Sequence, residues 1–338
     1  MKDKSHSNDS YYISETLRKS LGIYKLKFDY LDEVFESNGE IYKNIYINID
    51  CILKSIYKLS KILDDNDNYA ITLSAAIINL VAHYKLYFAK NNSYPKFYLF
   101  ISKENDLYFL KDNIKDMDNI LKVIFKYVPN VYYIRCDNSI DSSMYHFLKD
   151  NKNNLVLSRS VMDLQLLSAD TDLLYLKRDE SILYNKYNLF DNYLDIEHSN
   201  LDHKLFPIFL SITGVKDIAN GVKKIGKKRA HKLLESYINN GIMQTHYINI
   251  NDFICDAEII DPNIVSVLQR NYEIIDTINT YSQFSNSDKK KLDNYIVDKF
   301  SYNDIKELNV KYFTGEDYIM LNELMIVSGK DKNKRIVW

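Results

Sequence analysis

Four short apolar runs separated by segments of helical periodicity are the feature that most limits how this chain can fold. The runs are NIYINID at 44–50, KFYLFIS at 96–102, VYYI at 131–134 and LVLS at 155–158. Between them, apolar residues at helical spacing predict helices over 70–90, 116–127 and 142–149. This alternation is typical of an α/β protein in which helices cover a mainly parallel sheet of buried strands.

The second half of the chain has a different pattern. From about Leu201 onward the periodicity becomes mainly helical, with the clearest helical segments at 261–279 and 287–300. We therefore expect four regions, namely an N-terminal extension, an α/β domain, a helical region and a C-terminal extension, over 1–43, 44–208, 209–308 and 309–338.

The composition sets limits on the class of protein. A chain of 338 residues with 46% hydrophobic and 27% charged residues can bury a sizeable core. Its three cysteines, Cys51, Cys136 and Cys255, stand singly, without C-x-x-C or paired histidine spacing. Neither a disulfide framework nor a structural zinc site is indicated.

The sequence contains no membrane or secretion signal. No apolar run approaches the roughly 18 residues that a membrane span needs, and the polar start MKDKSHSNDS lacks the apolar stretch of a signal peptide. We expect a soluble, intracellular protein without a membrane partner. The 29 tyrosines, together with abundant Asn, Ile, Lys and Asp, are typical of an AT-rich genome. We therefore expect a phage or viral protein in the host cytoplasm or in the virion.

Asp50 stands at the end of the first apolar run. Residues just past the carboxyl ends of parallel strands converge on one crevice, so acids at these positions can form a metal site. A two-metal phosphodiesterase needs several such carboxylates, because both the attacking and the leaving oxygen must be flanked by hard cations. The alternative interpretation is that Asp50 caps the helix that follows the strand.

The stretch NGVKKIGKKRAHKLL, Asn220 to Leu234, concentrates positive charge in a chain whose formal net charge is −2. Two glycines predict a tight turn that exposes backbone N–H groups to a phosphate at the start of a helix. The surrounding cations would make binding to a nucleic acid backbone salt-dependent and indifferent to sequence. The predicted backbone-binding residues are Gly221, Lys223, Lys224, Gly226, Lys227, Lys228 and Arg229. The alternative is a solvated basic helix end.

Over about residues 44 to 280 the chain resembles the flap endonuclease and 5′-3′ exonuclease family, which has a PIN-like α/β domain followed by a helix-hairpin-helix. TGVKDIANGVKKIGKKRA, Thr213 to Ala230, is similar to the family's G-D-x-x-D-N-I-P-G-V-x-G-I-G-x-K-T-A, with Lys224 in place of a glycine. VLQRNYEIIDT, Val267 to Thr277, resembles a later helix of phage-type members. The resemblance implies a PIN-like 5′-nuclease fold with a mainly parallel central sheet and a helical C-terminal region.

The resemblance also shows which catalytic acids this chain lacks. Three of the nine acidic positions are kept, as Asp50, Asp141 and Asp217. The second strand ends at Ser102, the E-A-D-D motif falls on Ser139, Ile140, Asp141 and Ser142, and the first hairpin acid is Gly214. In the S-x-D-x-D motif, SRSVMDLQL at 158–166 places Ser160 and Met162 at the acid positions.

A second alignment of the last motif is possible. SADTDLLYL, Ser168 to Leu176, keeps both acids as Asp170 and Asp172, and five of the nine acids would then remain. It requires a longer segment after Asp141 and a strand that carries Asp163 and Gln165. We favour the first alignment, because LVLS is a properly apolar strand and the following DLLYLKRDESILY then forms a hairpin.

Losing four or more carboxylates would remove most of the charge that holds two divalent cations, so we expect no metal and no cofactor. The expected function is a catalytically inactive, nuclease-like protein that binds DNA backbone without sequence preference, in a phage particle or replication complex. One alternative is an active, divergent 5′-3′ nuclease that uses Mg²⁺ or Mn²⁺. The other is an assembly protein that does not bind nucleic acid.

Both ends of the chain lie outside the resemblance and are expected to contact other protein subunits. Aromatic residues of the kind that anchor interfaces occur there. These predicted interface residues are Tyr11, Tyr12, Tyr24, Tyr30 and Trp338. Deleting residues 1 to 40 should leave a folded but unassembled protein.

Overall fold

The computed structural model describes residues 31, 35, 42–60, 69–103, 113–126, 128, 130–177, 181–239, 250, 253 and 262–293. The described residues form two compact units. The first contains those up to Arg135, together with Leu176 and Lys177, and the second contains those of Cys136–Tyr175 and Ser181–Asp293. Each unit is described by itself.

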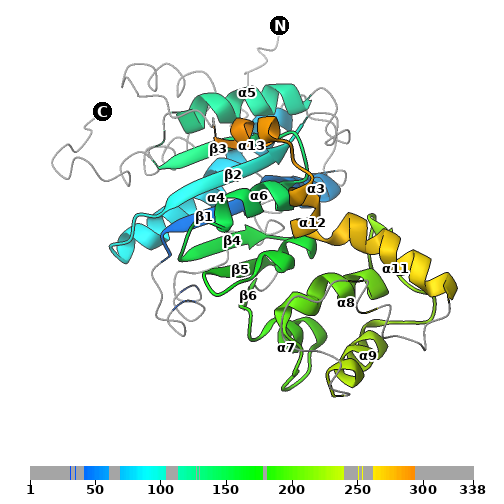
Figure 1. The fold of residues 1–338 in the computed structure, drawn as a ribbon. Helices are drawn as coiled ribbons and strands as arrows, with labels where there is room; N and C mark the ends of the chain where they lie inside the picture. Colours follow the sequence, from blue (N-terminus) through cyan, green and yellow to red (C-terminus); the bar gives the residue numbers. More distant parts are fainter. Residues whose placement is uncertain are drawn as a thin grey trace, which may run out of the picture. The chain divides into compact units, whose positions relative to one another are not determined.

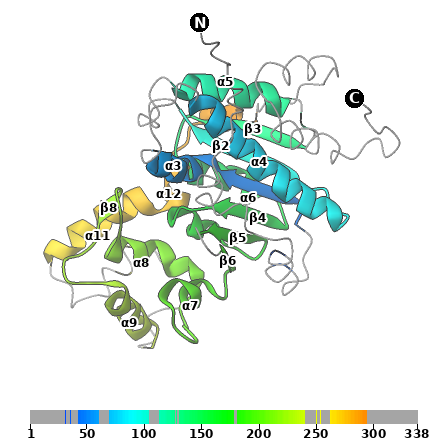
Figure 2. The same cartoon turned by 180° about the vertical axis from the view of Figure 1, so that it is seen from behind.

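The first unit is a layer of strands covered by helices. Its strands are β1 (Asn44–Asn48), β2 (Lys96–Ser102) and β3 (Val131–Cys136), in the order β3-β2-β1, and β1 and β2 run parallel. Its helices are α3 (Ile49–Ser60), α4 (Tyr69–Lys90) and α5 (Asn113–Lys126). Figure 2 shows α3 and α4 on the same face of β1 and β2, and α4 also packs against α5.

The core of the first unit explains these elements. All five residues of β1 are buried, which accounts for its continuous apolar run. Most of the described side chains of α4 are buried, and even Lys85 is only 5% exposed. Aromatic rings continue across the three strands, because Tyr98 stacks on Tyr46 and on Tyr132 with centroid distances of 5.0 Å in each pair.

The second unit combines short strands with a helical region. Its strands are β4 (Asn154–Ser158), β5 (Thr171–Leu176), β6 (Ser181–Tyr184), β7 (Gly214–Val215) and β8 (Ala219–Asn220). Strand β5 lies between β4 and β6, β4 and β5 are parallel, and β7 and β8 form an antiparallel pair. The α-helices are α6 (Ile140–Leu148), α7 (Leu189–Leu194), α8 (Phe206–Thr213), α9 (Lys227–Asn239), α11 (Pro262–Ile275), α12 (Thr277–Ser282) and α13 (Asn286–Asp293). Two 3₁₀ turns, η2 (Met162–Leu166) and η3 (His203–Leu205), complete it.

Helix α8 is the centre of the helical region. It is apolar on nearly every side, and it packs against α9 and α11, as Figure 1 shows. The rings of Phe206 and Phe209 on α8 meet Phe190 on α7 at centroid distances of 5.6 and 5.5 Å. This packing holds the first half of α8 against α7, and the loop that leads to α9 begins at the carboxyl end of α8.

The predicted strands and helices that fall on described residues are present, with shifts at their ends, whereas residues 294–300 of the helix predicted over 287–300 lie outside the described residues. The strand at 96–102 has the predicted bounds, whereas the first strand ends at Asn48 and not at Asp50. The helix predicted over 261–279 is two helices, α11 and α12, joined at Asp276. The domain ranges 44–208 and 209–308 stay a prediction. In the described part of the chain, no helix is both long and apolar enough to cross a membrane.

Candidate functional site

The carboxyl ends of β1 and β2 bring together two predicted site residues, Asp50 and Ser102. The register pairs Asn48 with Phe100, so each site residue lies two positions past this pair. Asp50 is 7% exposed, and its Oδ1 accepts a hydrogen bond from the backbone N–H of Ser102 at 3.1 Å. Asp50 lies in the first turn of α3, where the helix dipole favours a carboxylate.

The position of Asp50 corrects the expectation of an acid at the last position of a strand. The side-chain oxygen of Asn48 accepts a hydrogen bond from the backbone N–H of Cys51 at 3.3 Å, which caps α3. The helix therefore begins at Ile49, directly after the strand, and Asp50 belongs to the helix.

A second buried carboxylate in this unit, Asp118 on α5, was not predicted from sequence. Only 4% exposed, it accepts hydrogen bonds from Lys122 Nζ at 2.6 Å, the Tyr133 hydroxyl at 2.8 Å and Arg135 Nη1 at 3.0 Å. Burial, and then the negative charge of Asp118, raise the pKa of Tyr133 well above its ordinary value, so Tyr133 stays a neutral donor. The available signals were the D-x-x-x-K spacing on a helix and the Y-x-R alternation on the next strand.

The register of β4 and β5 places the two alternative acids, Asp170 and Asp172. Asn154 pairs with Thr171 and Leu155 with Asp172, and the backbone N–H of Asn154 donates to the carbonyl of Asp170 at 2.8 Å. Both acids therefore lie at the amino-terminal end of β5, with Asp170 in the turn before it. The carboxyl end of β4, at Ser158, is about 10 Å further along the strands at roughly 3.3 Å per residue.

The segment that follows β4 contains Ser160 and Met162, which take the family's acid positions in the favoured alignment. The Ser158 hydroxyl accepts from the backbone N–H of Ser160 at 2.9 Å and donates to the carboxylate of Asp163, which is 1% exposed. The Ser160 hydroxyl accepts from the N–H of Met162 at 3.2 Å. These serines therefore build the turn from β4 into η2. The signal for this turn was the spacing S-x-S-x-x-D.

Asp141, the one acid kept from the E-A-D-D motif, lies in the first turn of α6. Its Oδ2 accepts a hydrogen bond from the hydroxyl of Thr277 at 2.7 Å, and the hydroxyl of Ser142 donates to the carbonyl of Thr277 at 3.1 Å. Gln165 on η2 adds two further bonds, accepting from Thr277 N–H at 3.4 Å and donating to the Ile275 carbonyl at 2.9 Å. Asp141 therefore helps to hold α12 against α6 and η2. Ser139 is the N-cap residue and Ile140 is buried.

Two glycines fix the loop between α8 and α9 by close backbone contact. A Cβ atom on Gly214, whose φ is +77°, would lie 2.2 Å from the backbone nitrogen of Gly221. A Cβ on Gly221 would in turn lie 2.2 Å from the carbonyl oxygen of Thr213. In this conformation a side chain at Gly214, such as the aspartate of the family pattern, would clash with the backbone. Asp217 is exposed in the turn between β7 and β8, with φ of 65°.

The basic residues predicted from the glycine-rich stretch surround the start of α9. Lys223, Lys224, Lys227, Lys228 and Arg229 are all exposed. The first N–H groups of a helix have no acceptor within the helix, so this end of α9 is positive in its backbone as well as in its side chains. Lys227 Nζ lies 3.9 Å from the centroid of the Tyr193 ring, and partial burial lowers the pKa of Lys227. We call this surface, Gly221 to Arg229, the basic loop.

Two remaining predictions concern metals and protein interfaces. Among the described residues, no group of three or more His, Cys, Asp or Glu side chains is gathered so that it could hold a metal ion. The Ser, Met and Gly residues at most of the family's acid positions do not fit a site for two divalent cations, which requires carboxylate oxygens. The predicted interface residues Tyr11, Tyr12, Tyr24, Tyr30 and Trp338 lie outside the described residues.

Parallel strands, helices on the strand layer and a glycine-anchored loop leading into a basic helix define an α/β protein with a helical second half. No family model matches the sequence, and no curated protein is similar to it. Among solved structures, the chain resembles the eukaryotic junction-resolving enzyme GEN-1 with cesium, with a TM-score of 0.51, 10% identity, and 91% of this chain and 74% of that chain covered. The Holliday junction-resolving enzyme GEN1 with product DNA and Mg²⁺ matches with a TM-score of 0.50 and 13% identity, and the match covers 94% of this chain and 77% of that chain.

A T5 5′-exonuclease also matches, with a TM-score of 0.43, 14% identity, and 85% of this chain and 99% of that chain covered. The two GEN1 likenesses show that the chain shares the α/β fold of these junction-resolving enzymes. At these identities the likeness concerns the fold alone, so the activity has to be argued from the residues of this chain.

Proposed function

We propose that the protein is a nuclease-like DNA-binding protein that does not cleave DNA. Its fold would hold the basic loop in the geometry of a helix-hairpin-helix and present it to the DNA backbone. The observation that carries the proposal is the β4–β5 register, in which Asp170 and Asp172 lie at the opposite end of the strand pair from Ser160 and Met162.

The positions of the acids in the structure disfavour cleavage. In this fold, ligands bind outside the carboxyl ends of the strands, and Asp170 and Asp172 lie at the amino-terminal end of β5. Asp141 accepts a hydrogen bond from Thr277, and Asp217 lies exposed in a hairpin turn. Two-ion catalysis needs carboxylates that converge on ions about 4 Å apart. Among the residues that the structure describes, no group of three such side chains converges on one point.

The basic loop supports DNA binding. Five exposed cations surround a helix start whose backbone also favours anions, and the glycine contacts hold this loop in place. Such a surface contacts phosphates without reading bases, because none of its groups needs a particular base edge. The GEN1 structure with product DNA has the same fold, which agrees with this proposal.

We further propose that the protein acts with other subunits, as a structural component of a phage particle or replication complex in the host cell. This part rests on the composition and on the aromatic residues of the two chain ends. Removing residues 1 to 40 and measuring the assembly state in solution tests it. Unchanged assembly would contradict the proposed role of these residues.

DNA binding is tested by replacing Lys223, Lys224, Lys227 and Lys228 together with Gln and measuring affinity for plain duplex over a range of salt. Each phosphate contact contributes about 0.9 to the slope of log affinity against log salt, so the slope should fall by up to about 3.6. The matched control replaces four exposed lysines outside the basic loop, Lys96, Lys152, Lys177 and Lys290, with the same change in net charge.

The control should keep the slope of the unmodified protein, because diffuse charge alone does not create phosphate contacts. An equal loss in both variants would show that the protein binds DNA through overall charge and not through the basic loop. No duplex binding by the unmodified protein would instead favour an assembly protein without nucleic acid contacts.

A further inference from the structure

A pocket of about 460 Å³ lies at the amino-terminal end of β5, within the second unit. It is lined by the end of α6, the turn between η2 and β5, η3 with the start of α8, and the junction of α11 with α12. Small-molecule sites have volumes of about 300 to 1,000 Å³, so a ligand of that size would fit. The family's acid positions fall at the carboxyl end of β4, so this pocket is a separate feature.

The walls combine aliphatic side chains with two aromatic rings. Three buried leucines line the pocket, Leu148, Leu166 and Leu167. Tyr145 and Tyr272 also line it and are half-buried, and the ring of Tyr145 packs edge-on against that of Tyr281 at a centroid distance of 5.3 Å. Such walls favour a ligand with an aliphatic or aromatic body.

Two lysines line the pocket, Lys149 and Lys204. Lys149 is held in place, because its Nζ donates to the hydroxyl of Tyr281 at 3.0 Å and lies 5.2 Å from the centroid of that ring. The hydrogen bond with Tyr281 raises the pKa of Lys149, so the ammonium group stays charged at neutral pH. Lys204, on η3, is exposed. The lysines can therefore bind an anionic group of a ligand.

Two aspartates line the pocket, and they differ in how they are bonded. Asp276 is 4% exposed and caps α12, since its Oδ1 accepts from the N–H groups of Ile278 at 2.9 Å and Asn279 at 3.1 Å. Asp170 is half-buried, and its backbone N–H donates to the hydroxyl of Ser168 at 3.2 Å. Among the described residues, no hydrogen bond or ion pair engages its carboxylate. This carboxylate favours a cationic group of a ligand.

The charges that line the pocket are balanced. His203 lines it as well, with its Nδ1 3.0 Å from Oδ1 of Asp202, and burial lowers the pKa of His203, so the imidazole is neutral at pH 7. Two lysines therefore face two aspartates in number. An anion alone would leave the carboxylate of Asp170 without a partner, and a cation alone would leave the lysines without one. One ligand with both charges satisfies both sets.

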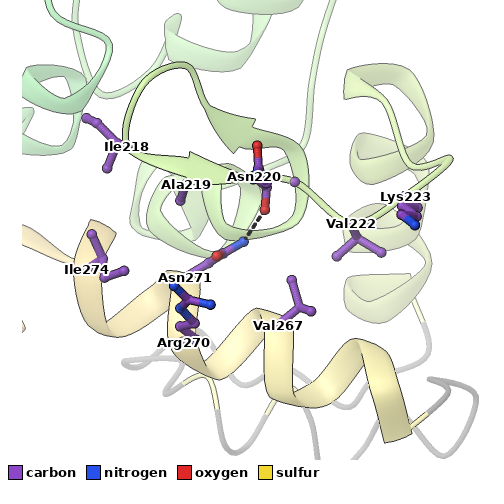
Figure 3. Close-up of a pocket in the computed structure, with 10 residues that line it drawn as sticks. Ile218, Ala219, Asn220, Val222, Lys223, Val267, Arg270, Asn271 and Ile274 are labelled. Atoms are coloured by element: carbon purple, nitrogen blue, oxygen red, sulfur yellow. Dashed lines mark hydrogen bonds between the residues drawn. The ribbon is translucent and has the colours of Figure 1, made fainter.

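Helix α11 carries Tyr272 and Asp276, and its position is fixed by Asn271. The Nδ2 of Asn271 donates to the carbonyl of Asn220 at 2.8 Å, as Figure 3 shows, and to the carbonyl of Ser211 at 2.9 Å. Asn271 is 5% exposed, so both bonds are largely shielded from water. A ligand would thus meet side chains that are already in place, which reduces the entropic cost of binding.

We propose that this pocket binds a small zwitterion with an apolar body, the class of free amino acids and dipeptides. The ammonium group of the ligand binds Asp170, its carboxylate binds Lys149 and Lys204, and its side chain contacts the leucines and the tyrosine rings. This binding goes beyond the proposed function and does not depend on DNA, because no residue of the basic loop lines the pocket.

The experiment uses three probes with the same phenyl body and isothermal titration calorimetry at pH 7. L-phenylalanine carries both charges, phenethylamine only the ammonium group and 3-phenylpropionate only the carboxylate. Losing one charge-assisted hydrogen bond costs about tenfold or more in affinity, so phenylalanine should bind at least about tenfold more tightly than either other probe. Leucylphenylalanine serves as a second zwitterion. Equal affinities of the three probes, or no saturable binding of either zwitterion up to about 10 mM, would overturn the proposal.

Two variants assign the charged groups. Asp170→Asn should weaken phenylalanine binding about tenfold and leave 3-phenylpropionate binding unchanged or tighter, because only the ammonium group uses this carboxylate. Lys204→Gln should weaken phenylalanine binding and leave phenethylamine binding unchanged or tighter. The matched control is Asp195→Asn, since Asp195 is exposed and does not line the pocket, and it should bind all probes like the unmodified protein. An Asp170→Asn variant with full affinity for phenylalanine would contradict the assignment.

A third variant, Ala169→Trp, tests the location without changing a charge. Ala169 is exposed in the turn before β5 and lines the pocket, so a large ring there should fill it and abolish binding of both zwitterions. Circular dichroism should match that of the unmodified protein, and duplex affinity should be the same in both, because the basic loop is intact. Unchanged zwitterion binding by Ala169→Trp would overturn the pocket assignment and leave the proposed function untouched.

Discussion

Lys224 has a backbone φ of 67°, a conformation that glycine adopts readily and other residues adopt at a cost. The family pattern has a glycine at this position, so the chain keeps the turn and gains a cation. We expect Lys224→Gly to raise the free energy of unfolding by about 0.5 to 1 kcal/mol, because relief of the strained φ outweighs the added freedom of the unfolded chain.

The same variant should lower the salt slope of duplex binding by about 0.9, because one phosphate contact is lost. Lys223→Gly is the control, since Lys223 is not among the described residues with positive φ. It should lower stability while changing the slope similarly. Chemical denaturation of both variants measures the free energies of unfolding. A destabilised Lys224→Gly would contradict the structural role assigned to this turn.

The two glycines of the basic loop differ in how closely other atoms surround them. A Cβ on Gly221 would lie 2.2 Å from the Thr213 carbonyl oxygen, whereas a Cβ on Gly226 would meet no atom within 4 Å. Gly221→Ala should therefore lower stability by about 2 kcal/mol or more, since backbone must shift, and Gly226→Ala should change it by less than about 1 kcal/mol.

Measuring duplex binding of the two variants tests whether a phosphate approaches the backbone of the loop, which stability alone does not show. If a phosphate approaches the backbone at Gly226, the added methyl group of Gly226→Ala should weaken duplex binding severalfold in a protein of unchanged stability. Thermal unfolding and duplex affinity of both variants are the measurements. Equal stability losses in the two variants would contradict the described loop geometry.

At the residue level, the sequence indicates which side chains are basic and which of the family's acid positions lack an acid. It does not indicate the contacts that these residues make. The glycine contact between Gly214 and Gly221 depends on backbone atoms that are seven positions apart in the chain, and no pattern of residue types shows it. Asp118 was missed for a similar reason. Its partners Tyr133 and Arg135 are on another element, and only the i,i+4 partner Lys122 is visible locally.

Helix α12 is held to α6 and η2 by hydrogen bonds that converge on Thr277, a residue that is 1% exposed. Thr277→Val keeps the shape of the side chain and removes the donor to Asp141. We expect it to lower the free energy of unfolding by about 1 to 2 kcal/mol, because the carboxylate loses a hydrogen-bond donor.

The control is Thr277→Ser, which keeps the hydroxyl and should recover most of the hydrogen-bond contribution. In a double-mutant cycle, Asp141→Asn with Thr277→Val should show a coupling of about 0.5 kcal/mol or more. Fully additive effects of the two changes would mean that the Asp141–Thr277 hydrogen bond contributes nothing.

Helix α4 buries an ammonium group, and this predicts a pH dependence. Burial lowers the pKa of Lys85 from 10.5 to about 8, so between these values the unfolded chain binds more protons than the folded one. Stability should therefore rise with pH, by about 2 to 3 kcal/mol between pH 7 and pH 10. Urea unfolding over this range measures it.

The free energy of unfolding of Lys85→Met should change less with pH over the same range, because the variant lacks the buried amine. For the same reason the variant should be more stable than the unmodified protein at pH 7. Above about pH 10, Tyr184 and Tyr193, whose pKa burial raises to about 12, favour unfolding, so the test ends there. If stability rose with pH equally in the variant and in the unmodified protein, Lys85 would not be the cause of the rise.

Single elements were the most predictable level of this fold. The strand Lys96–Ser102 has its predicted bounds, because a continuous apolar run between polar residues fits a buried strand. The register between strands was not predictable. From the sequence, either LVLS or the later segment with Asp163 and Gln165 could be the strand before the S-x-D-x-D motif, and the β4–β5 register is not visible in the residue pattern.

At the level of the whole molecule, the order of elements predicted a fold that solved nuclease structures share, while the chemistry depends on single positions. Apolar patterns survive extensive change, because any hydrophobic residue of suitable size keeps a core. A metal site does not survive such change, because replacing an aspartate with Ser or Met removes a ligand charge. Fold and activity can therefore separate in one chain.

The most direct measurement is cleavage of a 5′-flapped duplex at high Mn²⁺, under conditions where binding to the same probe is saturated. We predict that the DNA is bound through the basic loop and recovered uncut, because Ser160 and Met162 provide no carboxylates after β4. Accumulation of a flap product that depends on the divalent cation and is lost in Asp50→Ala and Asp141→Ala would contradict this account.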